Sequence, residues 1–276
     1  MPYLKTEGNI KIYYNYYKPN FKSKKPILLF IHGWLVNWTI FEQEIKYFKK
    51  KGYPILYLDL RGHGLSDKPK LPESYSIACM AKDIKLILIK EKIKKVVPIG
   101  FSLGGMVALM FNILYNQYVE KLILIDTSYK NPLFFSKISF FTFHKSFIKK
   151  LSKTLAKLLR YSVKRLEKKH EINFTKIKGI SDSLLFLKAT YSTPLIVNLG
   201  CLNAMFEYDV KDQLSKLNNS VLVITSKSDQ FFKNKLGVVF VNNIKKAQLI
   251  SIKGTHSILL KQPKIIEDSI ENFLDS

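Results

Sequence analysis

Residues 96–109 read Val-Val-Pro-Ile-Gly-Phe-Ser-Leu-Gly-Gly-Met-Val-Ala-Leu, with a Gly-x-Ser-x-Gly pattern at their centre. A β-branched run ends at Gly100, and an apolar segment suited to a helix begins after Gly105. Strand, tight turn and helix form the context in which such a serine becomes an exposed nucleophile. Small residues two positions either side of Ser102 let the strand and the helix pass closely. The alternative is a glycine-rich turn whose serine only caps the helix.

The segments on both sides of this turn alternate between apolar runs typical of buried strands and runs with helical spacing. Strands are expected at 27–31, 53–58, 121–125, 221–225 and 247–252, helices at 37–51, 76–92 and 258–273, and an N-terminal hairpin at 3–6 and 10–17. This alternation predicts an α/β fold with a mainly parallel sheet covered on both faces. Right-handed crossovers then bring the carboxyl ends of the strands to one edge, where ligands bind in such folds.

The composition is that of an ordinary globular protein. With 276 residues, of which 47% are hydrophobic, the chain can form one large domain with an insertion, or two domains. It shows neither the apolar core of a signal peptide nor a run of about 18 apolar residues. Its two cysteines, Cys79 and Cys201, indicate no disulfide framework. We expect a cytoplasmic protein.

Residues 128–210 interrupt the alternation and are predicted to form a helical cap, with 1–127 and 211–276 as the α/β core. Between His144 and Lys178 the sequence holds 12 Lys or Arg against two Glu, and the whole chain has a formal charge of +24. One interpretation is a Lys-, Ile- and Asn-rich composition with a solvated cap face. The other is docking to an acidic carrier protein or an anionic membrane surface through the basic cap. No nucleic-acid-binding signature is present, so nucleic acid is not an expected partner.

Several motifs in order resemble those of the α/β-hydrolase fold superfamily, and in particular its capped, esterase-like serine hydrolases. They are HGW at 32–34, DLRGHGLS at 59–66, GFSLGG at 100–105, the acid at Asp229 and GTHS at 254–257. The resemblance runs from about residue 8 to the end of the chain and keeps the family's order of nucleophile, acid and histidine. It implies a mostly parallel central sheet with helices on both faces and a helical cap inserted after the sixth strand.

By this resemblance Ser102 matches the nucleophile, Asp229 the acid and His256 the base. A serine hydroxyl becomes nucleophilic when a base takes its proton, and imidazole titrates near neutrality. A carboxylate behind the imidazole fixes its tautomer and stabilises the imidazolium. Asp126 also ends a predicted strand and is the alternative acid, since some relatives place theirs there.

The resemblance also assigns the binding groups. The backbone N–H groups of Trp34 and Leu103 match the donors that stabilise a tetrahedral oxyanion. Residues expected to line an apolar substrate pocket, with core packing as the alternative for each, are Trp34, Trp38, Phe101, Tyr129, Phe134 and Ile258. His32 and His63 stand in glycine-flanked turns and are expected to be structural.

The implied activity is hydrolysis of a small carboxylic ester through an acyl-enzyme. A methyl esterase acting on an acyl carrier protein, similar to that of biotin synthesis, is an alternative, as are lactonase, C–C hydrolase and cofactor-free perhydrolase activities. A non-catalytic ligand-binding fold is a further class, and the complete triad argues against it. Haloalkane dehalogenases and soluble epoxide hydrolases carry an aspartate where this chain has Ser102. No Walker lysine, G-x-G-x-x-G pattern or metal cluster is found, so neither cofactor nor metal is expected.

Overall fold

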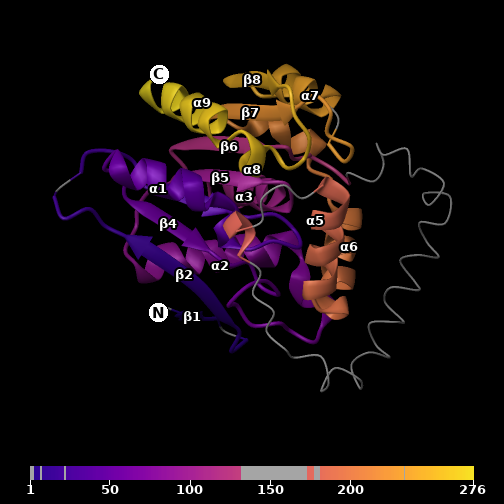
Figure 1. Ribbon diagram of the computed structural model, residues 1–276. Coiled ribbons are helices and arrows are strands. Elements are labelled where there is room, and N and C mark those ends of the chain that lie inside the picture. The colour runs from indigo at the N-terminus through magenta and orange to yellow at the C-terminus, as the bar shows by residue number, and fades with distance from the viewer. Residues whose placement is uncertain (1–2, 7, 22, 132–172, 177–180, 233) are drawn as a thin grey trace.

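The computed structural model describes residues 3–6, 8–21, 23–131, 173–176, 181–232 and 234–276 (Figure 1). Its centre is an eight-stranded sheet in the order β1-β2-β4-β3-β5-β6-β7-β8. The strands are β1 (Tyr3–Lys5), β2 (Lys11–Tyr17), β3 (Leu28–Ile31), β4 (Ile55–Leu58), β5 (Val97–Phe101), β6 (Lys121–Ile125), β7 (Ser220–Ser226) and β8 (Ala247–Ile252). Strand β2 runs antiparallel to β1 and β4, and the other neighbours are parallel, as the alternation predicted.

The described helices follow the strands in the chain. They are α1 (Glu42–Lys50), α2 (Ile77–Lys90), α3 (Leu103–Leu114), α5 (Asp182–Ser192), α6 (Leu195–Glu207), α7 (Lys235–Asn243), α8 (Ile258–Lys261) and α9 (Pro263–Asp275). Short 3-10 turns lie at η1 (Trp38–Phe41), η2 (Pro72–Tyr75), η3 (Asn116–Tyr118), η7 (Phe174–Lys176) and η8 (Lys211–Lys216). None of these helices alone has the length and hydropathy of a membrane span; Leu184–Thr190 and Leu195–Glu207 meet that test only together, with a bend of 110° between them.

The sheet separates two hydrophobic clusters because successive side chains of a strand point to opposite faces. Leu29 and Ile31 of β3 lie in the cluster with α2 and α3, whereas Leu28 and Phe30 lie in the cluster with α1 and α9. Helices α1 and α9 run side by side over their face (Figure 1). Burial on both faces explains why the central strands read as continuous apolar runs.

Two helical regions differ from the expectation. The predicted helix 258–273 is broken into α8 and α9 at Gln262, whose φ of −139° and ψ of 50° are not helical. Pro263 follows directly, and proline has no N–H to continue the hydrogen-bond ladder. Helix α7, between β7 and β8, is an element that the sequence analysis did not identify.

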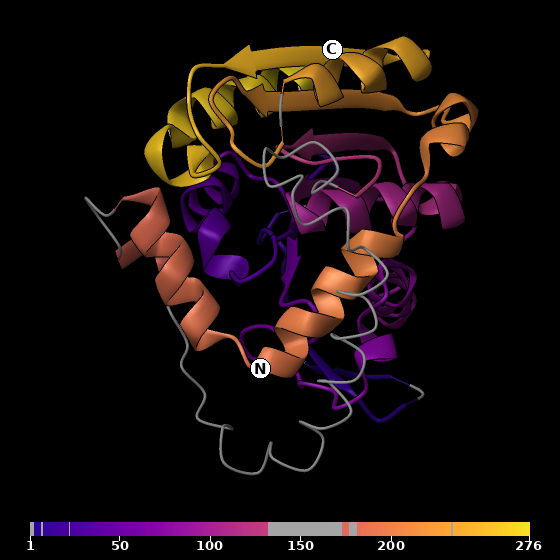
Figure 2. The same cartoon turned by 90° about the vertical axis from the view of Figure 1, so that its right-hand side faces the viewer.

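The chain between β6 and β7 forms the insertion, and within it the structure describes α5 and α6, here called the inserted helices. They form the two arms of a V (Figure 2). Phe134 and most of the basic segment, residues 144–172, lie outside the described residues. The division into a core of 1–127 and 211–276 and a cap of 128–210 stays a prediction.

The register of the parallel strands brings their carboxyl ends to one edge. Ile31 pairs with Gly100, Phe101 with Ile125, and Ile125 with Ile224. Each of these strands therefore ends level with its neighbour, and the residues that follow them meet at a common rim.

Candidate active site

Ser102 stands at the turn between β5 and α3 in a strained backbone conformation. Its φ of 56° and ψ of −121° are unfavourable for a residue with a side chain. The turn is held from β6, because the Ser102 N–H donates to the Ile125 carbonyl at 3.0 Å and the Thr127 hydroxyl donates to the Ser102 carbonyl at 2.7 Å. These bonds fix the serine between strand and helix with its hydroxyl at the rim of the sheet.

Three glycines allow the strand and the helix to cross at this turn. A Cβ on Gly100 would collide with the carbonyl of Gly104, and a Cβ on Gly104 would collide with the carbonyl of Ile31. On Gly105 it would lie 2.5 Å from the Cβ of Thr127. Each obstacle is backbone or a buried β-branched side chain, so it cannot swing aside, which is the steric reason for the Gly-x-Ser-x-Gly-Gly pattern.

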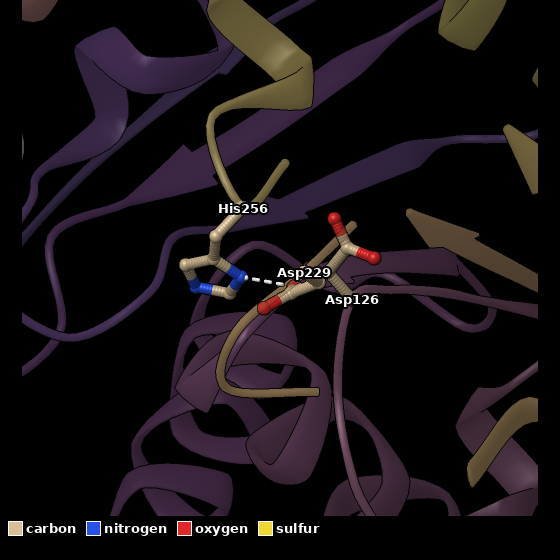
Figure 3. Close-up of side chains that lie close together, drawn as sticks. All are labelled: Asp126, Asp229 and His256. Atoms are coloured by element: carbon tan, nitrogen blue, oxygen red, sulfur yellow. Dashed lines mark hydrogen bonds and ion pairs between the residues drawn. The ribbon is translucent and has the colours of Figure 1, made fainter. Parts of the chain in front are cut away.

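A chain of hydrogen bonds joins three side chains that are far apart in the sequence. The Nε2 atom of His256 lies 3.1 Å from Ser102 Oγ. The Nδ1 atom of His256 lies 2.7 Å from Asp229 Oδ2 (Figure 3). The other oxygen of Asp229 accepts the backbone N–H groups of Phe231 at 2.7 Å and Phe232 at 3.0 Å. Since Asp229 accepts from Nδ1–H, the Nε2 lone pair faces the serine hydroxyl.

The surroundings of His256 favour its role as a base. Burial lowers the pKa of the imidazole, but the charge of Asp229 and the hydrogen bond to it outweigh burial, so the pKa is raised above its ordinary value. The rings of Phe101 and Phe232 lie nearly parallel to the imidazole, with centroids 4.8 and 5.2 Å away. These rings restrict the imidazole to the plane in which it reaches both Ser102 and Asp229.

Asp126, the alternative acid, lies beside this chain of hydrogen bonds (Figure 3). Its two oxygens accept the backbone N–H and the hydroxyl of Ser226, each at 2.6 Å. Burial, and then the charge of Asp229, raise the pKa of Asp126 to about 7. Oxygens of both aspartates and a ring nitrogen of His256 lie within 4.8 Å of one another, a spacing that could hold a metal ion. All four carboxylate oxygens already accept hydrogen bonds from the protein, which argues against a metal site.

Two backbone N–H groups are placed to receive negative charge beside Ser102. Leu103 is the first residue of α3, where helix N–H groups have no intrahelical acceptor and carry partial positive charge. The loop that carries Trp34 packs against the serine, since a Cβ on Gly33 would lie 3.0 Å from Ser102 Cβ. In the described part of the chain, no protein acceptor takes the N–H of Trp34 or Leu103. Such a pair of donors is what an oxyanion requires.

His32 and His63, the two histidines that stand beside glycines, join the loop after β3 to the loop after β4. The His63 Nε2 atom accepts the N–H of Leu35 at 3.3 Å, and the His32 Nε2 atom accepts the N–H of Leu60 at 2.9 Å. Burial is the main cause that lowers the pKa of His63 to about 4 and the pKa of His32 well below its usual value. Both rings are therefore neutral near pH 7, in the tautomer that accepts at Nε2.

A cavity of about 310 Å³ opens on Ser102 and His256. Of the predicted lining residues, Trp34 and Phe101 contribute to its wall. Tyr129 and Ile258 do not: the Tyr129 ring packs against Phe240 in the core, and Ile258 is fully buried at the start of α8.

Of the two remaining predicted lining residues, Trp38 is not part of this wall. Trp38 stacks on Tyr57 with ring centroids 4.7 Å apart. Phe134 lies outside the described residues.

Most of the cavity wall was not predicted. It comes from the loop after β3 with η1, the loop after β7, α8 and the inserted helices: Leu35, Val36, Ile40, Phe231, Phe232, Leu259, Leu260, Leu185, Phe186, Ala189, Leu202 and Met205. Phe231 and Phe232 stand two and three residues after Asp229, so their position in the cavity wall could have been inferred. Within the described part of the chain, no lysine or arginine side chain lines this cavity.

A mostly parallel sheet with a strained serine turn at its carboxyl edge, opposite a histidine from the end of β8, defines the class of α/β-hydrolases. The sequence agrees, since the family model described as alpha/beta hydrolase fold matches residues 26–263. The chain belongs to this family.

Two curated relatives match over part of their length. Epoxide hydrolase 4 of Mus musculus is 39% identical over 102 residues, 37% of this chain and 28% of the relative. The AB hydrolase superfamily protein YisY of Bacillus subtilis is 32% identical over 127 residues, 46% of this chain and 45% of the relative. The matches thus span less than half of either relative. An esterase from Exiguobacterium antarcticum shares the fold, with a TM-score of 0.75, 22% identity and 99% coverage of both chains.

Proposed function

We propose that the protein is a serine hydrolase that cleaves carboxylic esters through an acyl-enzyme. The observation that carries the proposal is the hydrogen-bonded order of Asp229, His256 and Ser102 at the mouth of an apolar cavity. Each group stands within reach of the atom on which it has to act, and the neutral imidazole faces the hydroxyl through Nε2.

In the first half-reaction, Ser102 Oγ attacks the ester carbonyl carbon while its proton passes to His256 Nε2. The carbonyl oxygen becomes an oxyanion and accepts the N–H groups of Trp34 and Leu103. Asp229 stabilises the imidazolium. The intermediate collapses when the C–O bond to the alcohol breaks and His256 returns its proton to the leaving oxygen, which leaves an acyl group on Ser102.

In the second half-reaction, a water molecule replaces the alcohol. His256 takes a proton from the water as its oxygen attacks the acyl carbon, and the same two N–H groups receive the oxyanion. Breakage of the bond to Ser102 Oγ, with return of the proton from His256, releases the carboxylic acid and restores the hydroxyl.

Epoxide hydrolysis is a second candidate because of the name of the mouse relative, and the nucleophile argues against it. A carboxylate that opens an epoxide forms an ester, which water can cleave at the carbonyl carbon. The hydroxyl of Ser102 would form an ether with the same carbon, and an ether has no carbonyl for water to attack. We therefore expect no sustained turnover of epoxides.

The cavity supports an uncharged substrate. A buried ion without a partner is strongly disfavoured, and among the residues that the structure describes no lysine or arginine lines the wall, although the whole chain carries a formal charge of +24. Asp182 reaches the wall, but its Oδ1 atom already holds the Ser257 hydroxyl and the Lys261 ammonium. Neutral esters and lactones with apolar substituents fit these walls. Carrier-protein esters would in addition require a docking role of the basic segment.

Active-site labelling together with steady-state kinetics tests the proposal. A fluorophosphonate probe is expected to label Ser102, and p-nitrophenyl esters of uncharged acyl groups are expected to turn over with a burst. Ser102→Ala should abolish labelling and lower kcat by at least about 10⁴-fold. Ser215→Ala, the same change at an exposed serine, is the matched control and should leave both unchanged. Absence of labelling in the folded wild-type protein would refute the proposal.

A further inference from the structure

The side chain of Trp34 is bonded to the insertion rather than to the sheet. Its indole Nε1–H donates to Oδ1 of Asn198 in α6 at 3.2 Å. Asn198 is 7% exposed, so this bond is shielded from water. The Trp34 ring also meets Phe186 of α5 edge to face, with centroids 6.3 Å apart. Both inserted helices therefore contact this one residue.

The amide of Asn198 is held on its other side by backbone. Its Nδ2 group donates to the carbonyls of Thr193 at 3.2 Å and Thr190 at 3.4 Å, where α5 turns into α6. Because two carbonyls hold the NH₂ group, the amide oxygen has to face the indole. Asn198 thus holds both the corner between α5 and α6 and the Trp34 ring. This corner is the apex of the V that the two helices form (Figure 2).

The next residue along the chain is held from the opposite side. Leu35 has a φ of 68°, and its N–H donates to His63 Nε2 of the core. The core thus holds residue 35 and the insertion holds the side chain of residue 34. The N–H proposed to receive the oxyanion belongs to the residue whose side chain the insertion holds, and Gly33 packs this loop against Ser102.

We propose that Asn198 is a positioning residue that couples the inserted helices to the oxyanion-binding N–H of Trp34. The inference rests on the proposed function, since it concerns the same serine site. Leu202 and Met205 line the cavity from the same helix, α6, so the helix that contacts the substrate also sets the position of an oxyanion donor. Misplacement of a donor affects the transition state more than the bound ester, because the full oxyanion exists only there.

Three substitutions separate this role from simple packing. Asn198→Leu removes the acceptor with little change of volume, and Trp34→Phe removes the indole N–H but keeps a ring and the backbone N–H. Asn198→Gln keeps both an oxygen for the indole and an NH₂ group for the carbonyls of Thr190 and Thr193. Asn203→Leu, the same change one turn further along α6, is the matched control, since Asn203 is outside the cavity wall and makes no bond to Trp34.

We expect Asn198→Leu and Trp34→Phe each to lower kcat for a p-nitrophenyl ester about tenfold with KM within about twofold. The double variant should lose no more than either single variant, because both remove one interaction. Asn198→Gln, which keeps an amide at this position, should lose less than Asn198→Leu. Affinity for an alkyl boronic acid, which forms a tetrahedral adduct on the serine, should fall by the same factor as kcat.

Labelling by the fluorophosphonate probe keeps the two proposals apart. Failure of the wild-type protein to label rejects the proposed function itself. A protein that labels and turns over, but whose Asn198→Leu variant keeps kcat within twofold, rejects the coupling alone. Losses that multiply in the double variant, or that Asn203→Leu reproduces, reject it as well. If Asn198→Leu does not fold, Trp34→Phe decides the same question, because a kcat within twofold of the wild-type value rejects the coupling.

Discussion

Two carboxylates lie next to one imidazole at this site, and their hydrogen-bond partners give them different roles. One oxygen of Asp229 accepts a hydrogen bond from His256, and the other accepts two backbone N–H groups. Both oxygens of Asp126 accept hydrogen bonds from Ser226. Only Asp229 can therefore orient the imidazole, whereas Asp126 acts on it through its charge alone.

The pH dependence of Asp229→Asn follows from this difference. In the wild-type protein the raised pKa of His256 places the acidic limb of kcat/KM above pH 6.5, and activity is lost as pH falls through it. In Asp229→Asn the imidazole of His256 is still buried, which lowers its pKa, but the charge that raises this pKa is lost. The acidic limb of the kcat/KM profile should therefore move to lower pH. The plateau should fall about 10⁴-fold, as loss of the orienting carboxylate does in other triads.

Asp126→Asn provides the matched comparison. It removes a weaker charge contribution to the His256 pKa and no hydrogen bond to the ring, so the limb should move less and the plateau should fall less than tenfold. Profiles of kcat/KM from pH 4.5 to 9 measure both effects. If the larger plateau loss came from Asp126→Asn, the acid would have been assigned to the wrong strand.

The proximity of Ser102, Asp229 and His256 could be predicted because each follows an apolar run whose carboxyl end has a fixed place in a parallel sheet. The wall of the cavity could not. Helix α6 is apolar on nearly all sides, from Leu195 to Phe206, so its sequence has no periodicity that tells which residues face a substrate. The role of Asn198 was missed for the same reason, since an asparagine in an apolar helix does not indicate which residue its amide contacts.

At the scale of the helices, the contact between α1 and α9 contains a buried carboxyl group. Glu44 of α1 is fully buried, and neither of its oxygens has a hydrogen-bond partner in the part of the chain that the structure describes. Burial above all raises its pKa to about 8, and the charge of Glu267 in α9 adds to the effect. The folded protein therefore binds this proton more tightly than the unfolded chain, whose carboxyl has its ordinary pKa.

Glu44→Gln is expected to stabilise the protein at alkaline pH. Because the folded pKa lies above the unfolded one, the wild-type protein should lose stability as pH rises from about 4.5 to about 8, and the variant should not. The variant should gain about 1–3 kcal/mol in free energy of unfolding at pH 8 and little at pH 5. Urea denaturation between pH 5 and pH 9 measures the difference.

Glu42→Gln is the control on the same helix. Its carboxylate pairs with the exposed Lys46 at 2.7 Å, so the change should cost less than about 1 kcal/mol at either pH. Parallel stability curves for wild type and Glu44→Gln would show that the Glu44 carboxyl has an ordinary pKa in the folded protein.

Over the whole molecule, the sheet separates two hydrophobic clusters, and a polar contact joins α5 to α8 beside His256. Asp182 Oδ1 accepts the Ser257 hydroxyl at 2.8 Å and the Lys261 ammonium at 2.6 Å. The two charged side chains are 37% and 47% exposed, so the ion pair should contribute less than about 1 kcal/mol.

Asp182→Asn should loosen α5 without disturbing the sheet. The amide can still accept from Ser257 but loses the charge opposite Lys261, so backbone amides of residues 182–192 should exchange hydrogen up to about fivefold faster. Exchange in β5 should not change. Asp268→Asn, which removes an exposed ion pair within α9, is the control. Equal protection of α5 in wild type and variant would mean that other contacts hold this helix.

Strands β6 and β7 pair directly from Lys121 with Ser220 to Ile125 with Ile224, so the whole insertion leaves and re-enters the sheet between adjacent strands. Such a connection suits recombination: a foreign segment could be grafted there without altering the strand order. A chimaera made in this way would bring its own pocket but would leave Trp34 without its acceptor, unless an amide were designed into the graft at the position of Asn198. Exchange of specificity between relatives would then carry a loss of rate that one well-placed asparagine could repair.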